Sequence, residues 1–141
     1  MKNLFVFILT LTLITPTLAA TVAPKPAGKV APLPDLEVVK LIATPLKNGK
    51  VRVLYTIKNS GHAKSGPSVT RVTISTAGIK EVRQNTPELK PGDLFTNSVE
   101  YALGKNGKYL FNVSADYLKQ VTESNERNNN KTIRFGISRT I

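Results

Sequence analysis

Residues 116–130, DYLKQVTESNERNNN, separate two strand-like runs near the C-terminus of the 141-residue chain. The segment is polar and rich in Asn, Asp and Glu. Asn and Asp tolerate left-handed backbone angles, and their side chains hydrogen-bond to nearby backbone groups. We therefore expect this segment to form a long, structured turn that joins two strands.

The segments on either side of this turn alternate apolar and polar residues. Residues 109–115 place Tyr, Phe, Val and Ala at alternate positions, and residues 133–137 do the same with Ile, Phe and Ile. A period of two is typical of a strand with one buried face. The pattern recurs toward the N-terminus, and the expected strands are residues 35–43, 51–58, 69–75, 79–85, 95–103, 109–115 and 133–137.

Turn signals separate these runs, such as Asn48-Gly49, which suits a type I′ hairpin turn. Seven short strands with turns at regular intervals, and no helical periodicity after the N-terminal apolar segment, predict an all-β fold. The fold class that we expect is an immunoglobulin-like antiparallel β-sandwich of about seven strands. Tyr109, at the start of the sixth expected strand, is the candidate for the tyrosine corner of such folds.

The N-terminus has the pattern of a secretory signal peptide. Lys2 supplies a positive charge, residues 4–14 are mostly apolar, and small residues follow Pro16 as far as Ala20. A membrane-spanning helix needs roughly 20 apolar residues, which this run does not reach. We therefore expect residues 1–20 to be cleaved and the protein to be exported to the periplasm or the extracellular space, with no transmembrane segment left.

The remainder of the chain divides into a linker and one domain. Residues 21–34 are rich in proline, which favours an extended linker. Residues 35–141 then form one domain. The chain has no cysteine, and this excludes disulfides, thiol catalysis and cysteine-ligated zinc sites.

The composition is strongly basic, with 20 Lys and Arg residues against 9 Asp and Glu residues and a formal net charge of +11. A basic exported protein meets anionic partners, such as lipid headgroups, acidic surface polymers or acidic proteins. Nucleic acid fits this charge but does not fit the export signal. The charge therefore indicates either an anionic partner at the cell envelope or a surface charge that serves solubility alone.

Short motifs along the chain share their order and spacing with a known family. They are DLEV at 35–38, IKNSG at 57–61, LKPG at 89–92, GKY at 107–109, and Asp116 with VTESNERNN at 121–129. Together they resemble the CARDB family, the cell-adhesion-related domain found in bacteria, over about residues 35–137. The resemblance implies an immunoglobulin-like sandwich, export, and a non-catalytic role in binding or as a spacer. Such domains usually occur in larger surface proteins, often in tandem, whereas this sequence contains one.

The turn also offers oxygen atoms that suit a hard cation. Ca²⁺ takes six to eight oxygen ligands, and the candidate ligands are Asp116, Glu123, Asn125, Glu126 and Asn128. Their spacing is not that of an EF-hand loop, and the segment has no glycine. The alternative is structural, because the same side chains can accept backbone N–H groups and fix the turn. We expect the structural role and no cofactor, with calcium as the alternative.

No group of residues points to catalysis. His62 is the only histidine and lies in a loop rich in Gly and Ser. A Ser-His-Asp triad needs a positioned base and a buried acid that orients it, and neither a nucleophile elbow nor a metal motif is present. We expect an exposed His62 and no enzymatic activity. Tyr117 is the one aromatic residue expected in a loop, which argues against stacking on carbohydrate.

The order of the loops predicts where positive charge gathers. Successive connections alternate between the two ends of a seven-strand sandwich, so the first, third and fifth connections share one end with the C-terminus. We call the candidate anion-binding residues at that end the basic pole; they are Lys47, Lys50, Lys80, Lys105, Lys108 and Arg139. Glu81 is the only acid expected nearby, whereas the opposite end is mixed in sign. A localised pole predicts salt-sensitive attraction of polyanions. The alternative is that lysines simply populate turns and keep the protein soluble.

These features predict an exported, non-catalytic binding or accessory module at the cell envelope, with an adhesion-like or protein-interaction role. Its expected partner is an envelope protein or an anionic cell-surface polymer bound at the basic pole. The alternative is a structural spacer or assembly subunit whose exposed edge strand pairs with a partner chain. Salt separates the two hypotheses, because charge-driven binding weakens with salt and strand pairing does not.

Overall fold

The computed structural model describes residues 22–75, 79–104 and 106–138. The strands in this part of the chain are β1 (Leu36–Pro45), β2 (Lys50–Asn59), β3 (Ser68–Ser75), β4 (Ile79–Thr86), β5 (Leu94–Ala102), β6 (Gly107–Ser114) and β7 (Asn130–Ile137). They confirm the expected strands. The largest difference is in β7, which begins at Asn130 rather than at residue 133, because its first polar residues already pair with β6.

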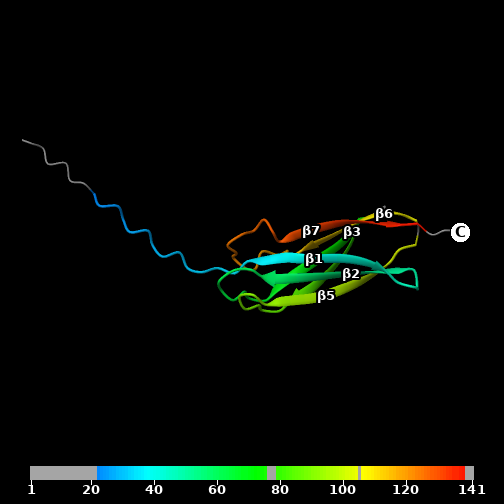
Figure 1. The fold of residues 1–141 in the computed structure, drawn as a ribbon, viewed down its shortest axis with the longest axis horizontal. Coiled ribbons are helices and arrows are strands. Elements are labelled where there is room, and N and C mark those ends of the chain that lie inside the picture. The colour runs from blue at the N-terminus through cyan, green and yellow to red at the C-terminus, as the bar shows by residue number, and fades with distance from the viewer. Residues whose placement is uncertain (1–21, 76–78, 105, 139–141) are drawn as a thin grey trace, which may run out of the picture.

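The strands form two antiparallel sheets that lie face to face (Figure 1). One sheet has the order β1-β2-β5, and the other has the order β4-β3-β6-β7. This arrangement is the expected immunoglobulin-like sandwich. The strand β4 joins the sheet of β3 because the two strands form a hairpin, in which Ser75 faces Ile79.

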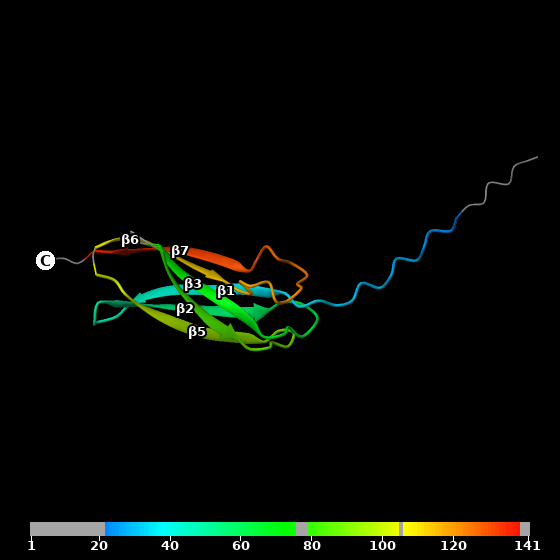
Figure 2. The same ribbon diagram turned by 180° about the vertical axis from the view of Figure 1, so that it is seen from behind.

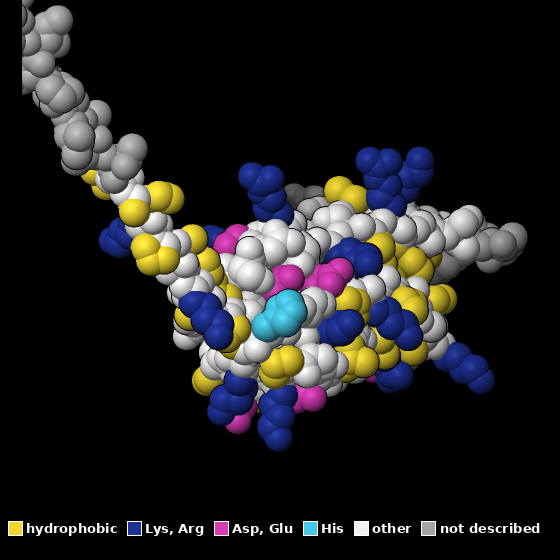
Figure 3. Space-filling view, turned by 60° about the vertical axis from the view of Figure 1, so that its left-hand side comes forward, with side chains coloured by type: hydrophobic (Ala, Val, Ile, Leu, Met, Phe, Trp, Pro, Cys, Tyr) yellow, Lys and Arg dark blue, Asp and Glu magenta, His cyan; other side chains and the backbone are white. Residues whose placement is uncertain are grey.

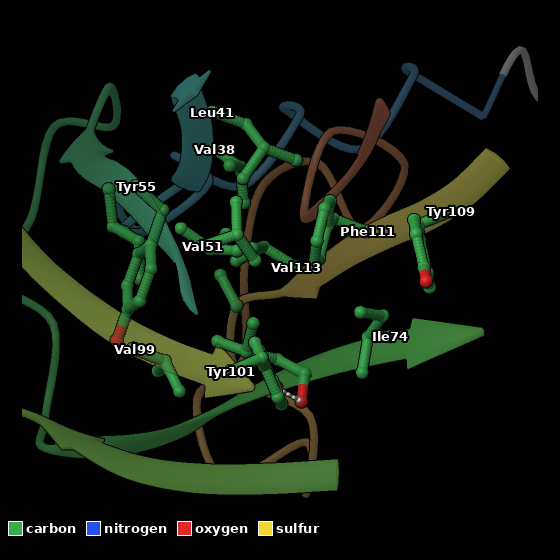
Figure 4. Packing of buried hydrophobic residues seen from close by; sticks show 14 of the residues in the cluster. Val38, Leu41, Val51, Tyr55, Ile74, Val99, Tyr101, Tyr109, Phe111 and Val113 are labelled. Atoms are coloured by element: carbon green, nitrogen blue, oxygen red, sulfur yellow. Dashed lines mark hydrogen bonds between the residues drawn. The ribbon is translucent and has the colours of Figure 1, made fainter. Parts of the chain in front are cut away.

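The core fills the space between the sheets with the alternate residues of each strand. From β2, Val51, Val53, Tyr55 and Ile57 are fully buried. Figure 4 shows Val51 and Tyr55 on the side of the other sheet, whose buried side chains include Ile74, Phe111 and Val113. Burying an apolar side chain of this size contributes roughly 1.5–3 kcal/mol, so the core is the main source of stability in a chain without disulfides.

A bulge keeps β1 in phase with this core. Val38 pairs with Ile57, whereas Lys40 pairs with Thr56, so the register shifts between Val38 and Lys40. An extra residue in one strand reverses which side chains face inward. The shift therefore allows Leu41 to be buried on the same side as Val38.

Two buried tyrosines connect one sheet to the other. Tyr101 of β5 donates its hydroxyl proton to the carbonyl oxygen of Val72 at 3.0 Å, and Tyr55 of β2 donates to Gln84 Oε1 at 2.6 Å. Burial raises the pKa of each tyrosine to about 12, so both hydroxyls stay protonated donors. Tyr109 is also buried, in β6, and its role as a tyrosine corner stays a prediction.

The two ends of the sandwich differ in what they carry (Figures 1 and 2). The proline-rich linker enters at one end, together with the β2–β3, β4–β5 and β6–β7 connections, and we call this the linker end. The β1–β2 connection, the ends of β3, β5 and β7, and the starts of β4 and β6 lie at the far end. This confirms the expected alternation of loops between two ends.

The linker docks on the domain at its last two residues. Leu33 accepts a hydrogen bond from the N–H of His62 at 2.9 Å, and Pro34 accepts one from the N–H of Ser124 at 2.9 Å. A Cβ atom at Gly61 would lie 2.5 Å from the carbonyl oxygen of Leu33, so the linker passes where only glycine leaves room. Residues 22–32 are exposed, and the expected signal peptide, residues 1–20, lies outside the described residues. None of the described residues form a helix that could span a membrane.

Candidate functional site

The β6–β7 turn, residues 115–129, is organised around the carboxylate of Asp116. This residue has a φ of 40°, in the left-handed region that Asp tolerates, and it is 2% exposed. Its Oδ1 accepts the N–H of Gln120 and its Oδ2 accepts the N–H of Val121, both at 2.9 Å. Asp116 therefore fixes the turn through backbone hydrogen bonds, as the structural interpretation of the sequence expected.

A second buried carboxylate, Glu123, ties the turn to the beginning of β1. Its Oε2 accepts the N–H of Leu36, and its Oε1 accepts a hydrogen bond from Asn129 Nδ2 at 2.6 Å. Burial raises the pKa of Glu123 to about 7; the two hydrogen bonds oppose this rise, and the charges of Glu126 and Asp116 add to it. The protonation state of Glu123 therefore changes near neutral pH.

The other candidate calcium ligands also take part in the turn. Asn125 Oδ1 accepts the N–H two residues further on at 3.1 Å, and Glu126 pairs with Lys119 Nζ at 3.0 Å. Asn128 Nδ2 donates to Asp35 Oδ1 at 2.8 Å. Among the described residues, no group of three or more His, Cys, Asp or Glu side chains is arranged to hold a metal ion. The absence of a cofactor stays a prediction, with calcium binding by this turn as its alternative.

The described members of the basic pole lie at the far end, around the β1–β2 hairpin and the neighbouring strands. Lys47 and Lys50 line a hollow of about 580 Å³, which Ile137 and Ser138 at the end of β7 also line. Lys80 near the start of β4 and Lys108 near the start of β6 are exposed. Lys105 and Arg139 lie outside the described residues.

The expectation that Glu81 is the only acid near this end was wrong. Glu100 of β5 lies 3.9 Å from Lys50 Nζ and 2.8 Å from Arg52 Nη2. The reason is the sheet order, because Arg52 and Glu100 face each other in the β2–β5 register. The alternation of loops along the sequence does not show which strands are neighbours. The sequence therefore did not show that Glu100 lies near these basic residues.

Charge at the linker end is mixed, as expected. Lys64 pairs with Glu88 at 3.0 Å, and Lys119 pairs with Glu126 at 3.0 Å. Figure 3 shows Lys and Arg side chains over much of the face that it draws, with acidic side chains among them. Positive charge is therefore not confined to the far end. Among the described lysines of the basic pole, Lys50 is the one with an ion pair, to Glu100.

Asn59 is a structural centre that the sequence did not reveal. It is fully buried, and its Oδ1 accepts the N–H groups of Asp35 and Gly61, both at 3.1 Å. Its Nδ2 donates to the carbonyl oxygens of Ala63 and Leu89, both at 2.8 Å. The sequence showed only a turn after β2, since nothing in the order of residues indicates that one amide joins three loops.

Two single residues were expected in loops. His62 is exposed, as predicted. Tyr117 is half-buried rather than a free ring, because the guanidinium carbon of Arg71 lies 3.9 Å from the ring centroid and that of Arg83 lies 5.3 Å from it. Tyr117 also lines a cavity of about 270 Å³ beside the β6–β7 turn.

Comparisons with known proteins place this fold in a family. The sequence model of the CARDB family matches residues 33–133. The chain belongs to the CARDB family. No curated protein matches the sequence.

Solved CARDB domains have the same architecture. The chain is similar to a CARDB domain from Pyrococcus furiosus, crystallised in complex with di-metal ions, with 23% identity, a TM-score of 0.64, and coverage of 74% of this chain and 93% of that one. It is also similar to a domain of a Methanosarcina acetivorans protein assigned to the cell surface, with 27% identity, a TM-score of 0.61, and coverage of 77% and 95%. CARDB is a non-enzymatic family, and this chain is a CARDB-type β-sandwich.

Proposed function

We propose that this CARDB domain is an exported binding module of the cell envelope that engages an anionic surface polymer through its basic pole. The observation that carries the proposal is the placement of Lys47 and Lys50 on a hollow at the far end. The linker enters at the opposite end (Figure 1). The pole therefore lies at the end of the domain away from the linker.

The chemistry of the pole suits long-range attraction rather than a tight pocket. Exposed lysine ammonium groups keep their hydration, and each contributes a modest attraction that salt screens over roughly 8 Å at physiological ionic strength. Glu100 offsets part of the charge of Lys50. The expected ligand is therefore a repeating polyanion that contacts several lysines at once, with binding that weakens steeply as salt increases.

A matched pair of variants tests the pole. The first replaces Lys47, Lys50, Lys80, Lys105 and Lys108 by Gln, and the control replaces Lys25, Lys29, Lys58, Lys64 and Lys90 by Gln, so both lose the same charge. Retention on heparin and on anionic liposomes should collapse at moderate salt for the first variant and change much less for the control. Equal losses in both variants would show that only total charge matters and would remove the localised site.

Export rests on the N-terminal signal pattern and on the likeness to a domain from a protein assigned to the cell surface. The exported form should begin near Thr21. Intact-mass measurement of the protein from the periplasm or medium checks this. A mass that still includes Met1 to Ala19 would contradict cleavage.

A second candidate function, assembly through strand pairing, is favoured by the edge strand β4. In the described part of the chain, β4 pairs with β3 alone, and Ile79 at its start is 75% exposed. An edge strand of this kind can accept a strand from a partner protein. Co-sedimentation with envelope proteins that persists between about 0.1 and about 1 M salt would favour assembly, because screening of charges does not weaken backbone hydrogen bonds.

A further inference from the structure

The sequence Lys-Asn-Gly-Lys occurs twice in the chain, at residues 47–50 and at residues 105–108. The first copy forms the β1–β2 turn, and the second spans the start of β6. The lysines of the two copies make up four of the six residues of the basic pole. Asn48 and Asn106 are both exposed, and they are the two asparagines of the chain that precede a glycine.

The two copies lie close to the same hollow at the far end. The N–H of Leu103 donates to the carbonyl oxygen of Gly49 at 3.3 Å, so the β1–β2 turn contacts the chain just after β5. Gly107 pairs with Ile137 in the β6–β7 register, and Ile137 lines the same hollow as Asn48. The first copy therefore lines this hollow, and the second adjoins it through β7.

An asparagine that precedes a glycine can lose its side-chain amide without any enzyme. The backbone nitrogen of the glycine gives up its proton to water and attacks Cγ of the asparagine. The new N–Cγ bond closes a five-membered succinimide ring, and the Cγ–Nδ2 bond breaks to release ammonia. Water then opens the ring to aspartate or isoaspartate, so a neutral amide becomes a carboxylate in either case. Glycine suits the attack because it has no Cβ to obstruct it.

The surroundings of Asn48 favour this reaction. Its Oδ1 accepts the N–H of Lys50 at 3.2 Å, and a donor at this oxygen stabilises the negative charge that forms there when Cγ is attacked. The N–H of Gly49 donates to the carbonyl oxygen of Leu46, also at 3.2 Å. This distance is at the long end of the range for such bonds, so little energy is needed to free the nitrogen. The neighbouring positive charges of Lys47 and Lys50 favour its deprotonated form.

The other asparagines of the chain do not precede glycine. Asn59 precedes Ser60 and is fully buried, with its side chain held by hydrogen bonds at both the oxygen and the nitrogen. Asn125 is exposed, but it precedes Glu126, whose side chain obstructs the attack. Exposure and a following glycine therefore coincide at positions 48 and 106.

We propose that Asn48 and Asn106 are sites of spontaneous deamidation, which lowers the charge of the basic pole as the protein ages. Each conversion reduces the net charge of the far end by one. Because Asn48 lines the hollow together with Lys47 and Lys50, the new carboxylate arises among the lysines of the pole. The effect on ligand binding rests on the proposed function, and it predicts that polyanion binding weakens with age.

Incubation of the purified protein at mildly alkaline pH, followed by peptide mapping with mass spectrometry, tests the modification itself. Peptides that contain position 48 or 106 should gain the mass of one amide-to-acid conversion, as a mixture of aspartate and isoaspartate. The peptide that contains Asn125 is the internal control and should keep its mass. A synthetic peptide of residues 45–51 gives the rate without the fold, and position 48 of the folded domain should react at most about tenfold more slowly. A domain that keeps both amides, or loses them no faster than that of Asn125, would overturn the proposal.

Two double variants separate the modification from its effect on binding. Asn48→Gln with Asn106→Gln keeps both neutral amides, but its longer side chains would have to close a six-membered ring, which forms much more slowly. This variant should keep its mass and its retention on heparin during the incubation, whereas the retention of the wild-type protein should fall. Asn48→Asp with Asn106→Asp should show the lower retention without incubation. An equal gain of mass in the glutamine variant would overturn the proposal. Deamidation of the wild-type protein without a fall in retention would confirm the modification sites and contradict the proposed role of the basic pole.

Discussion

The two ends of the sandwich use the same kinds of polar residue in opposite ways. At the linker end, Asn59, Asp116 and Glu123 are buried and bind backbone groups of several loops. At the far end, Asn48 accepts one exposed hydrogen bond from the N–H of Lys50 at 3.2 Å. Lys47 and Lys80 there are exposed.

Burial explains why the loss of a polar side chain has different effects on stability at the two ends. A buried amide or carboxylate that loses its partners leaves backbone groups unsatisfied, whereas water replaces the partners of an exposed one. The linker end is therefore built to hold the linker and the long turn in one geometry. The far end keeps its charges in water, where they act at a distance and contribute little to folding.

The largest expected effect comes from removing the amide of Asn59. Asn59→Ala would leave two N–H groups and one carbonyl group without a partner, whereas the carbonyl of Leu89 keeps the N–H of Ser65. The free energy of unfolding should therefore fall by at least about 3 kcal/mol. Urea denaturation of the purified domain measures this change. Asn48→Ala at the far end is the matched control and should cost less than about 0.5 kcal/mol. Similar costs at the two positions would contradict the contrast between the ends.

A smaller loss of stability is expected for Asp116, because its side chain accepts hydrogen bonds from one turn. Asp116→Ala removes the acceptor of the Val121 N–H and should lower the free energy of unfolding by on the order of 1–3 kcal/mol. The change should be the same with EDTA as with calcium if the role is structural. A melting temperature of the wild-type domain that rises strongly with calcium would instead support the calcium interpretation, because a ligand that binds the native state stabilises it.

Glu123 makes the linker end sensitive to pH. Its pKa is raised from 4.5 to about 7 by burial, so between these values the folded state binds a proton that the unfolded state has released. Stability from this group is therefore complete below about pH 4.5 and is lost as the pH rises toward 7, with a slope of at most about 1.4 kcal/mol per pH unit. Urea denaturation at intervals from pH 4 to pH 8 measures the slope.

Glu123→Gln should flatten this part of the pH profile. The glutamine carbonyl can still accept the N–H of Leu36, and its amide can donate to Asn129 Oδ1 if the asparagine amide turns over, since that oxygen has no partner in the wild-type protein. An unchanged slope in the variant would assign the pH dependence to other groups.

The strands were predictable because the alternation of apolar and polar residues is a property of consecutive residues. The apolar residues at alternate positions of β2 predict a strand with one buried face; Val51, Val53, Tyr55 and Ile57 are all fully buried. The assignment of the loops to the two ends was also predictable, since successive loops alternate between the ends of a sandwich. The bulge between Val38 and Lys40 did not follow, because it depends on how β1 is aligned with β2 rather than on β1 alone.

The sites were less predictable because they depend on residues far apart in the sequence. Glu100 meets Arg52 only through the pairing of β5 with β2. Arg71 and Asn129 line the same cavity beside the β6–β7 turn. They are far apart in the sequence, and no local pattern connects them. What the sequence did show was the chemistry of the β6–β7 turn, whose polar residues act on backbone groups close by.

The smallest expected effect is on the stability of the far end. Replacing Lys47, Lys50, Lys80, Lys105 and Lys108 by Gln removes an ion pair of 3.9 Å between Lys50 and Glu100, whose side chains are 46% and 36% exposed. Exposed pairs contribute about 0–1 kcal/mol, and the variant also loses repulsion among like charges. We expect the urea midpoint to stay within error of the wild type while retention on heparin collapses. A clear loss of stability would mean that these lysines pack or pair within the fold, and it would undo the separation between an end that stabilises the domain and an end that faces its ligand.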